Sequence, residues 1–279
     1  MDRTILLPSD FSESARSAMH YSQQLYKGRG YRYIILNTVE PNVASSNAGM
    51  IVNMSEIISK DSLEGLKKEK EWLSALPESE GNIIETVQMF GEFVSCVRQI
   101  VKDKGINMVI LGTTGSSGLK EFFVGSNAAA IIQEIAVPVL TVPYQANFQE
   151  ISRVVFPTDL KPLKDPNILK FLKDLVIKRS AELILLNVVK EESKVSDAQK
   201  ASEKEFLLNY FESVGVSFET IKYEDTVEGI NAYVNSRNDI DVIAMVPRKK
   251  NFFEKIFSKS VAKKVAFHAN IPILTLQDG

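Results

Sequence analysis

Residues 108–128, which decide the fold class, read Met108-Val-Ile-Leu-Gly112-Thr-Thr-Gly115-Ser-Ser-Gly-Leu-Lys-Glu-Phe-Phe-Val-Gly125-Ser126-Asn127-Ala128. They begin with a short apolar run that predicts a buried strand and lead into apolar residues at helical spacing. The loop between the strand and the helix contains several glycines. Because glycine has no Cβ, backbone N–H groups near it can approach phosphate oxygens, and a helix N-terminus adds unpaired donors. The stretch therefore predicts a strand, an anion-binding loop and a helix.

The spacing of this loop excludes two common phosphate-binding motifs. A P-loop ends in Gly-Lys-Ser/Thr, and a dinucleotide fingerprint follows the first strand of its unit, whereas this loop follows a late strand. The observed spacing is Gly-x2-Gly-x9-Gly-Ser, and its final residue, Ser126, can cap the helix or donate to a phosphate. Spacing alone leaves a glycine-rich turn without a ligand open as the alternative.

Apolar runs alternate with helical patterns on both sides of this stretch. Further strands are predicted at residues 4–7, 33–39, 83–89 and 137–142, with a helix capped by Ser12 and a charged helix over residues 61–76. Residues 41–59 are mixed in Ser, Asn, Ala and Met and predict a loop. An alternation of this kind implies a parallel sheet covered by helices on both faces.

The whole pattern then occurs a second time. Ile5-Leu-Leu-Pro-Ser-Asp10 returns as Val154-Val-Phe-Pro-Thr-Asp159, and Ile34-Ile-Leu-Asn-Thr-Val39 returns as Ile184-Leu-Leu-Asn-Val-Val189. The fourth strand returns at residues 240–246 and the fifth at 271–276. Internal repeats of this kind indicate duplicated units. We therefore predict two similar α/β domains, residues 1–146 and 147–279.

Both halves resemble universal stress protein domains. The motifs that carry the resemblance are Pro-Ser/Thr-Asp after the first strand, the glycine loop of the first half, and a fifth strand of the form Val/Ile-Pro-Val/Ile. The resemblance implies two similar doubly wound α/β domains, each with a five-stranded parallel sheet flanked by helices, of the adenine nucleotide alpha hydrolase-like type. Two generic doubly wound domains of duplicated ancestry are the alternative.

The two halves differ where the phosphate loop is expected. Opposite Gly112, Gly115 and Gly125 the second half has Val246, Lys249 and Lys259. A side chain fills the space that a phosphate needs, and valine or lysine does not enter the positive-φ region without strain. We therefore predict one nucleotide site per chain, in the first half, and a degenerate loop in the second.

The resemblance implies ATP as the ligand, with or without Mg²⁺, and no protein metal cluster. It assigns the hydrophobic Val39 to the base, Asp10 to the adenosine or a metal, and the glycine loop to ribose and phosphates. Asn127 and Ala128 depart from the small β-branched or hydroxyl residues usual in the family, and Ala128 has no hydroxyl to offer a phosphate. The full set implied by the resemblance is Pro8, Ser9, Asp10, Val39, Leu111, Gly112, Thr114, Gly115, Gly125, Ser126, Asn127 and Ala128. For Asp159, in the second half, we expect an N-cap instead.

Composition limits the other classes of function. The net charge of −2 argues against a nucleic-acid partner, the single cysteine suits a reducing compartment, and no apolar run approaches the ~18 residues of a membrane span. We expect a cytoplasmic, nucleotide-binding stress-response regulator. No catalytic triad or paired carboxylates are visible, so weak ATP hydrolysis is the most that we expect. An interaction module without a nucleotide is the other alternative.

Two segments suggest partners. The fifth strands, residues 137–142 and 271–276, are apolar edge candidates, and exposed edges favour pairing. The resemblance implies that the two halves pair through them within the chain, and a further homodimer is left open. Residues 248–264 are rich in lysine and predict a solvated loop, with a docking surface for an acidic partner as the alternative.

Overall fold

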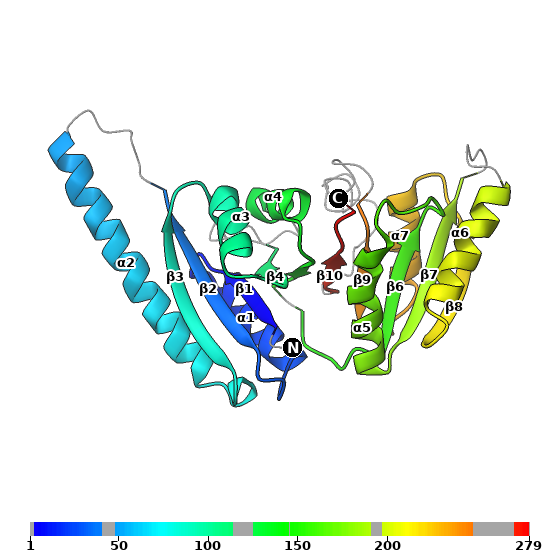
Figure 1. The fold of residues 1–279 in the computed structure, drawn as a ribbon, viewed down its shortest axis with the longest axis horizontal. Coiled ribbons are helices and arrows are strands. Elements are labelled where there is room, and N and C mark those ends of the chain that lie inside the picture. The colour runs from blue at the N-terminus through cyan, green and yellow to red at the C-terminus, as the bar shows by residue number, and fades with distance from the viewer. Residues whose placement is uncertain are drawn as a thin grey trace. The chain divides into compact units, whose positions relative to one another are not determined.

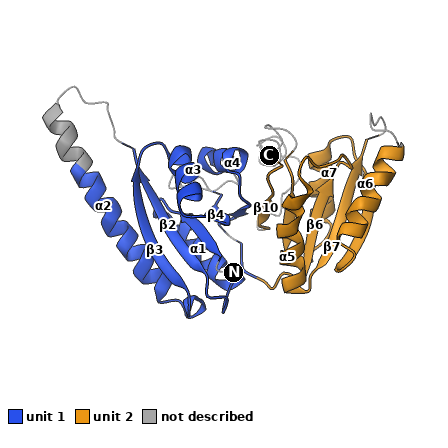
Figure 2. Cartoon of the chain, viewed as in Figure 1, with its two compact units in different colours: residues 1–148 blue, residues 149–279 orange. Residues whose placement is uncertain are grey.

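The computed structural model of the chain describes residues 3–40, 48–113, 125–144, 146–190, 197–247 and 271–278, and gives the backbone alone for residues 48–55 and 197 (Figure 1). The chain divides into two compact units, unit 1 (Met1–Phe148) and unit 2 (Gln149–Gly279), which are coloured separately in Figure 2. Among the described residues, no helix is both long enough and apolar enough to cross a membrane.

Unit 1 contains a parallel sheet whose strands lie in the order β3-β2-β1-β4-β5. Its central strands are continuous buried runs of Ile, Leu and Val, as expected for a sheet that is covered on both faces. The elements are β1 (Thr4–Pro8), α1 (Glu13–Leu25), β2 (Arg32–Val39), α2 (Ala48–Ser74), η1 (Pro77–Ser79), β3 (Ile83–Phe90), α3 (Phe93–Asp103), β4 (Met108–Gly112), α4 (Ser126–Glu134) and β5 (Val139–Val142).

The helices of unit 1 form two pairs, which can be followed in Figure 1. Helices α1 and α2 are joined by an ion pair between Arg16 and the buried Glu69, with Nε and Oε1 2.9 Å apart. Helices α3 and α4 are joined by Arg98 and Glu134. Parallel crossovers are right-handed, and the strand order reverses at β1, so the two pairs cover opposite faces of the sheet.

Unit 2 repeats this topology, with its strands in the order β8-β7-β6-β9-β10 and all described pairs parallel. Its elements are β6 (Arg153–Thr158), η2 (Pro166–Ile168), α5 (Leu169–Arg179), β7 (Glu182–Val189), α6 (Asp197–Tyr210), β8 (Gly215–Lys222), α7 (Thr226–Asn235), β9 (Val242–Met245) and β10 (Ile273–Thr275). The predicted fold class, two similar doubly wound α/β domains, is confirmed.

One prediction of local structure is wrong. Residues 48–59 were expected to belong to a loop, but they form the first part of α2, which runs from Ala48 to Ser74. The serines and asparagines in this stretch are poor helix formers, which favoured the loop interpretation. At the end of this stretch the helix contacts β3, where the Gln88 Nε2 donates to the carbonyl oxygen of Ser59 at 2.8 Å.

Candidate functional site

The candidate site of unit 1 lies at the carboxyl ends of β1, β2 and β4. Strand β1 is hydrogen-bonded to β2 on one side and to β4 on the other. The strand order of the sheet therefore reverses at β1. This is the switch point of a doubly wound sheet, where ligands of such folds bind. The predicted residues Pro8, Val39 and Gly112 are the last residues of these three strands.

A hydrogen-bonded turn follows β1. The Ser9 N–H donates to the carbonyl oxygen of Leu36 at 2.8 Å, and the Ser9 hydroxyl oxygen accepts from the Phe11 N–H at 3.1 Å. The Oδ1 of Asp10 accepts from the Ser12 N–H at 3.1 Å, and Ser12 then caps α1, as predicted. The turn leaves the Asp10 carboxylate exposed at the carboxyl edge of the sheet.

This turn is strained and is held in place by α2. Phe11 has a φ of 66°, a region that bulky residues rarely enter and that the surrounding structure must impose. Its ring packs on Gly65 of α2, where an added Cβ would lie 2.6 Å from the ring. Glycine at position 65 therefore makes room for Phe11, and the position of Asp10 depends on α2.

A side-chain amide that the sequence reasoning missed supports the same turn. The Asn37 Nδ2 donates to the carbonyl oxygen of Ser9 at 2.8 Å, and its Oδ1 accepts from the Ser62 hydroxyl at 2.6 Å. Asn37 therefore links β1, β2 and α2 directly beneath the candidate site. The signal was present in the sequence, since an asparagine interrupts the same apolar strand in both halves, at Asn37 and Asn187.

Gly112, at the end of β4, is required by packing. A Cβ at this position would lie 2.7 Å from the carbonyl oxygen of Ser14 on α1, and closer still to the Ser14 Oγ. The backbone of Gly112 does not have a positive φ. The expectation that loop glycines supply positive φ is therefore wrong for Gly112, and what its missing side chain allows is the close approach of α1 to β4.

Gly125, at the start of α4, is required neither by its backbone conformation nor by packing against the described residues. It is the N-cap of α4 with a φ of −56°, so the expectation of a positive φ is also wrong here. Among the described atoms, an added Cβ would meet only the carbonyl oxygen of Thr113, at a comfortable 3.6 Å. The same carbonyl accepts from the Gly125 N–H at 2.7 Å, which closes the loop between β4 and α4.

The first turn of α4 presents its backbone without a side-chain cap. Ser126 was expected to be able to cap the helix, but it is the first residue of α4, because Gly125 takes the N-cap position. Ser126 and Asn127 are exposed, whereas Ala128 is buried. Since the first N–H groups of a helix have no acceptor within the helix, this end of α4 offers donors and a positive dipole end.

The structure thus brings ten of the twelve predicted residues to one edge of unit 1, and Thr114 and Gly115 lie outside the described residues. The side chains of Val39 and Leu111 are buried in the core. The Val39 carbonyl oxygen accepts from the Gly91 N–H at 3.1 Å, so this residue acts structurally as well. In the described part of the chain, no group of three or more His, Cys, Asp or Glu residues could hold a metal ion.

A hydroxyl–carboxylate contact fixes the start of α1 beside this edge. The Tyr144 hydroxyl donates to the Glu13 Oε2 at 2.5 Å, and the Tyr144 carbonyl oxygen accepts from the Ser17 hydroxyl at 3.1 Å. The hydrogen bond to the Glu13 carboxylate raises the pKa of the Tyr144 phenol, because ionisation would place two negative charges side by side. The phenol therefore stays a donor to the first turn of α1.

Unit 2 keeps the turn after its first strand. The Thr158 Oγ1 accepts from the Leu160 N–H at 3.1 Å, the Asp159 Oδ1 accepts from the Lys161 N–H at 3.3 Å, and Leu160 has a φ of 53°. The Asn187 Nδ2 donates to the carbonyl oxygen of Thr158 at 2.8 Å. Each of these contacts has its counterpart in unit 1, so the turn is a property of the duplicated fold.

The segment after that turn differs between the units. Helix α1 begins at Glu13, three residues after Asp10, whereas α5 begins at Leu169, ten residues after Asp159. The expectation that Asp159 is an N-cap is wrong, because Asp165 caps the short helix η2 that precedes α5. Unit 2 therefore has no helical turn directly after its first strand. The loop residues Lys249, Lys259 and Ser260 lie outside the described part of the chain.

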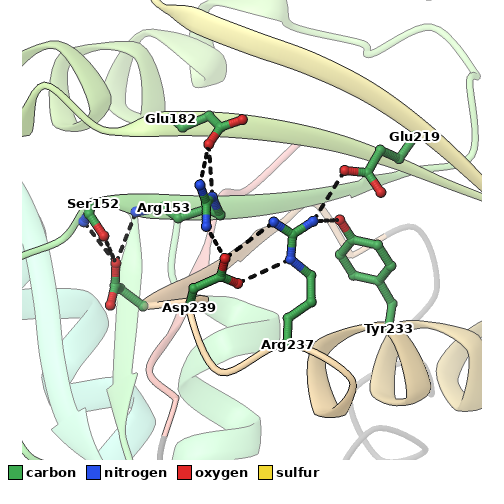
Figure 3. Close-up of polar contacts among 8 residues, drawn as sticks. Ser152, Arg153, Glu182, Glu219, Tyr233, Arg237 and Asp239 are labelled. Carbon is green, nitrogen blue, oxygen red and sulfur yellow. Dashed lines mark hydrogen bonds and ion pairs between the residues drawn. The ribbon is translucent and has the colours of Figure 1, made fainter.

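A charged cluster lies at the opposite, amino edge of the unit 2 sheet (Figure 3). Arg153, the first residue of β6, pairs with Glu182 and Asp239, and Arg237 pairs with Asp239 and Glu219. Its hydrogen bonds with Arg237 hold the pKa of the Asp239 carboxyl below its usual range. Because each arginine in the figure faces carboxylates, the cluster is satisfied internally and we interpret it as structural.

The comparison with known families decides the class of protein. The model of the universal stress protein family matches the chain twice, over residues 1–143 and 150–277. The chain belongs to the universal stress protein family. It is a tandem member, with one family domain in each half.

Individual relatives are distant. The chain is 27% identical over 144 residues to universal stress protein MJ0531 of Methanocaldococcus jannaschii, a match that covers 50% of this chain and 81% of the relative. It is 24% identical over 161 residues to MJ0577 of the same organism, which covers 51% and 95%. A crystal structure of a universal stress protein from Archaeoglobus fulgidus superimposes with a TM-score of 0.70 at 17% identity, and covers 99% of this chain and 98% of that one. At this identity the superposition shows a shared fold.

Proposed function

We propose that this universal stress protein binds one adenine nucleotide, ATP, at the switch point of unit 1, and acts as a nucleotide-dependent regulator in stress response. One observation carries the proposal. Gly125 precedes the open first turn of α4, and neither its backbone conformation nor the described residues around it require a glycine. A glycine that its described neighbours do not need, placed at a helix N-terminus, supports a ligand that approaches the backbone.

The residues present fit the chemistry of a nucleotide. The N-terminal N–H groups of α4 suit phosphate oxygens, and the exposed hydroxyl of Ser126 and amide of Asn127 can add donors. The exposed carboxylate of Asp10 suits ribose hydroxyls or a Mg²⁺ ion that arrives with the nucleotide. Bound Mg²⁺ would neutralise phosphate charge. Thr114 and Gly115 complete the proposed site.

We propose that unit 2 binds no nucleotide. Its first helical turn begins seven residues after Asp159, so the carboxyl end of β6 has no helix N-terminus directly behind it. At the position of Gly112 it carries Val246, which is partly exposed. The lysines at positions 249 and 259 would place long side chains where unit 1 has glycines. In this proposal unit 2 is a domain that accompanies the nucleotide-binding unit 1. The pairing of the two fifth strands and the formation of a homodimer stay predictions.

The direct test is titration of the full chain with ATP by isothermal calorimetry. We expect saturable binding with a stoichiometry near one per chain, and a thermal midpoint that rises with ATP concentration by mass action. Native mass spectrometry of the purified protein would show whether a nucleotide copurifies. Absence of binding, with the protein folded, would favour an interaction module and contradict the proposal, and a stoichiometry of two would contradict the assignment to unit 1.

Turnover is the second question at the same site. We propose binding without fast catalysis, because the two exposed carboxylates at this edge, Asp10 and Glu13, accept structural hydrogen bonds from the Ser12 N–H and the Tyr144 hydroxyl. The measurement is steady-state release of ADP by wild type and by Asp10→Ala. Sustained turnover above about 1 s⁻¹, a typical lower rate for enzymes, would show that the protein is an ATPase if Asp10→Ala abolished it.

A further inference from the structure

The hydroxyl of Ser14 is buried beside the candidate site and has no hydrogen-bond partner among the described residues. Ser14 lies in the first turn of α1, and the residue is 5% exposed. Its Oγ finds no donor or acceptor in the described part of the chain. It is the atom nearest to the position of a Cβ on Gly112, so it lies against the end of β4.

An unpaired buried hydroxyl needs an explanation, because most such groups in folded proteins are satisfied. The other serines around this edge are paired: Ser9 accepts from Phe11, Ser12 accepts from Ala15, and Ser62 donates to Asn37. Ser22, two turns further along α1, is also fully buried and donates to the carbonyl oxygen of Met19 at 2.6 Å. Among these serines, Ser14 alone has a buried hydroxyl without a partner in the described part of the chain, and Ser217 in unit 2 is another buried serine of this kind.

Unit 2 supplies a natural comparison. The residue at the position of Ser14, by the offset of 149 that aligns Asp10 with Asp159, is Leu163, which has no hydroxyl. In unit 2 this position lies before the first helical turn, and the position of Gly112 carries Val246. The hydroxyl, the helical turn that carries it and the glycine that it faces are thus all features of unit 1.

We propose that the Ser14 hydroxyl is a further nucleotide-binding group, which donates a hydrogen bond to an oxygen of the ribose–phosphate part of the ligand. The inference rests on the proposed function and adds a residue that the sequence did not indicate. It assigns a second helix to the site, because Ser14 is placed by the capped N-terminus of α1 whereas the phosphate donors come from α4. A small, neutral hydroxyl adds no further charge beside the Asp10 and Glu13 carboxylates, which are near it in sequence.

The test is Ser14→Ala in the full chain, with ATP affinity and ligand-free thermal stability measured on the same samples. We expect the Kd for ATP to rise about tenfold, the loss of one hydrogen bond, while the ligand-free midpoint stays unchanged or rises. The stability does not fall because the hydroxyl that is removed has no partner in the ligand-free protein. Ser22→Ala is the matched control, for which we expect the opposite result: a lower midpoint and an unchanged Kd.

Each outcome decides the question. If wild type binds ATP and Ser14→Ala binds it equally well, this inference is overturned while the proposed function stands. If Ser14→Ala lowers the ligand-free midpoint as much as Ser22→Ala does, the hydroxyl has a structural partner and the inference is again overturned. If wild type binds no ATP, both the proposed function and this inference fail. Weaker ATP binding with undiminished ligand-free stability supports the inference.

Discussion

The two units keep the same turn at the end of their first strands and then diverge. In both, a hydroxyl and a carboxylate accept backbone N–H groups, a residue with positive φ follows, and an asparagine from the next strand binds the turn from below. In unit 1 a helix begins three residues later and packs on a glycine, whereas unit 2 lacks both features. The shared turn therefore belongs to the fold, and the helix start and the glycines distinguish the proposed site.

The amino edges of the two sheets also share a hydrogen bond in which the accepting residue differs between the units. In unit 1 the Asn107 Oδ1 accepts from the Thr4 N–H at 2.8 Å, and in unit 2 the Asp241 Oδ2 accepts from the Arg153 N–H at 2.9 Å. The geometry is conserved, but a neutral amide is exchanged for a carboxylate beside the charged cluster. A contact that only supports the fold can thus change its charge, because the hydrogen bond alone is required.

The largest effect is expected from Gly125→Lys, which gives unit 1 the residue found at the equivalent position of unit 2. The lysine side chain would occupy the space before α4, and we expect ATP affinity to fall by at least about 100-fold, or about 2.7 kcal/mol. The fold should be kept, because the φ of −56° suits any residue and a Cβ meets no close described atom. Calorimetry gives the affinity and thermal unfolding gives the stability.

Gly215→Lys is the matched control for that variant. Gly215 starts β8 in unit 2, is exposed, and has no described atom within 4 Å of an added Cβ. The substitution adds the same charge and the same side chain away from the proposed site, so ATP affinity should not change. Equal ATP binding by Gly125→Lys and wild type would remove the main support for the proposed site.

The next largest effect is expected from Gly112→Val, which copies Val246. The valine side chain would overlap Ser14, so we expect a loss of about 1–3 kcal/mol in the free energy of unfolding, typical of overpacking, together with weaker ATP binding. The reverse change, Val246→Gly, should create no ATP site, because unit 2 still lacks the helical turn after Asp159. Chemical denaturation measures the first variant, and a gain of a second ATP site in the reverse variant would show that the glycine alone makes the difference.

A smaller difference is expected between Asn37→Ala and Asn187→Ala. Each removes the amide that satisfies the carbonyl oxygen of the turn at 2.8 Å, and should cost about 1–3 kcal/mol of stability. Asn37 also accepts from Ser62, so its loss should cost more. Only Asn37→Ala should weaken ATP binding, because it loosens the turn that carries Asp10. Equal effects of the two variants on ATP affinity would mean that the turn does not position the ligand.

The smallest effect concerns pH and the amino edges. The pKa of Asp239 is held down mainly by its hydrogen bonds with Arg237, and the pKa of Glu85 in unit 1 mainly by its hydrogen bonds with Arg32. A depressed carboxyl pKa stabilises the folded state above the unfolded value, near 4, and this stabilisation is lost as the pH falls through the folded pKa. Both carboxylates are partly exposed, so each effect should be about 1 kcal/mol or less.

Thermal unfolding of Asp239→Asn and Glu85→Gln between pH 7 and pH 2 checks this expectation. Both variants should have a lower thermal midpoint than wild type at pH 7. This difference in midpoint should disappear as the pH falls below about 4. Asp239→Asn should show the larger gap, because Asp239 faces Arg153 as well as Arg237. A gap that persists at pH 2 would mean that the substitutions act through packing and not through charge.

The sequence was sufficient to predict the architecture because buried parallel strands can be recognised from their local pattern of apolar residues. Continuous runs such as Ile34-Ile-Leu, their alternation with helical spacing and their return in the second half gave the fold class and the family. It was insufficient for the first part of α2, residues 48–59, because local propensity there is poor and yet the helix forms. The cap interpretation was wrong for Ser126 and for Asp159, because a cap is defined by where the helix begins, which tertiary packing sets. The alternative for Ser126, donation to a phosphate, stays a prediction.

By itself the sequence determined which backbone positions carry no side chain, and therefore where a ligand has room to approach. Only the tertiary structure separated the reasons for those positions: Gly112 is required by the packing of α1, and Gly125 is not required by any described neighbour. It also brought Asn37 of β2 to the turn after β1, and Ser14 of α1 to the end of β4. The physical reason is that bonding and crowding depend on distances between segments far apart in the chain, which local pattern does not encode.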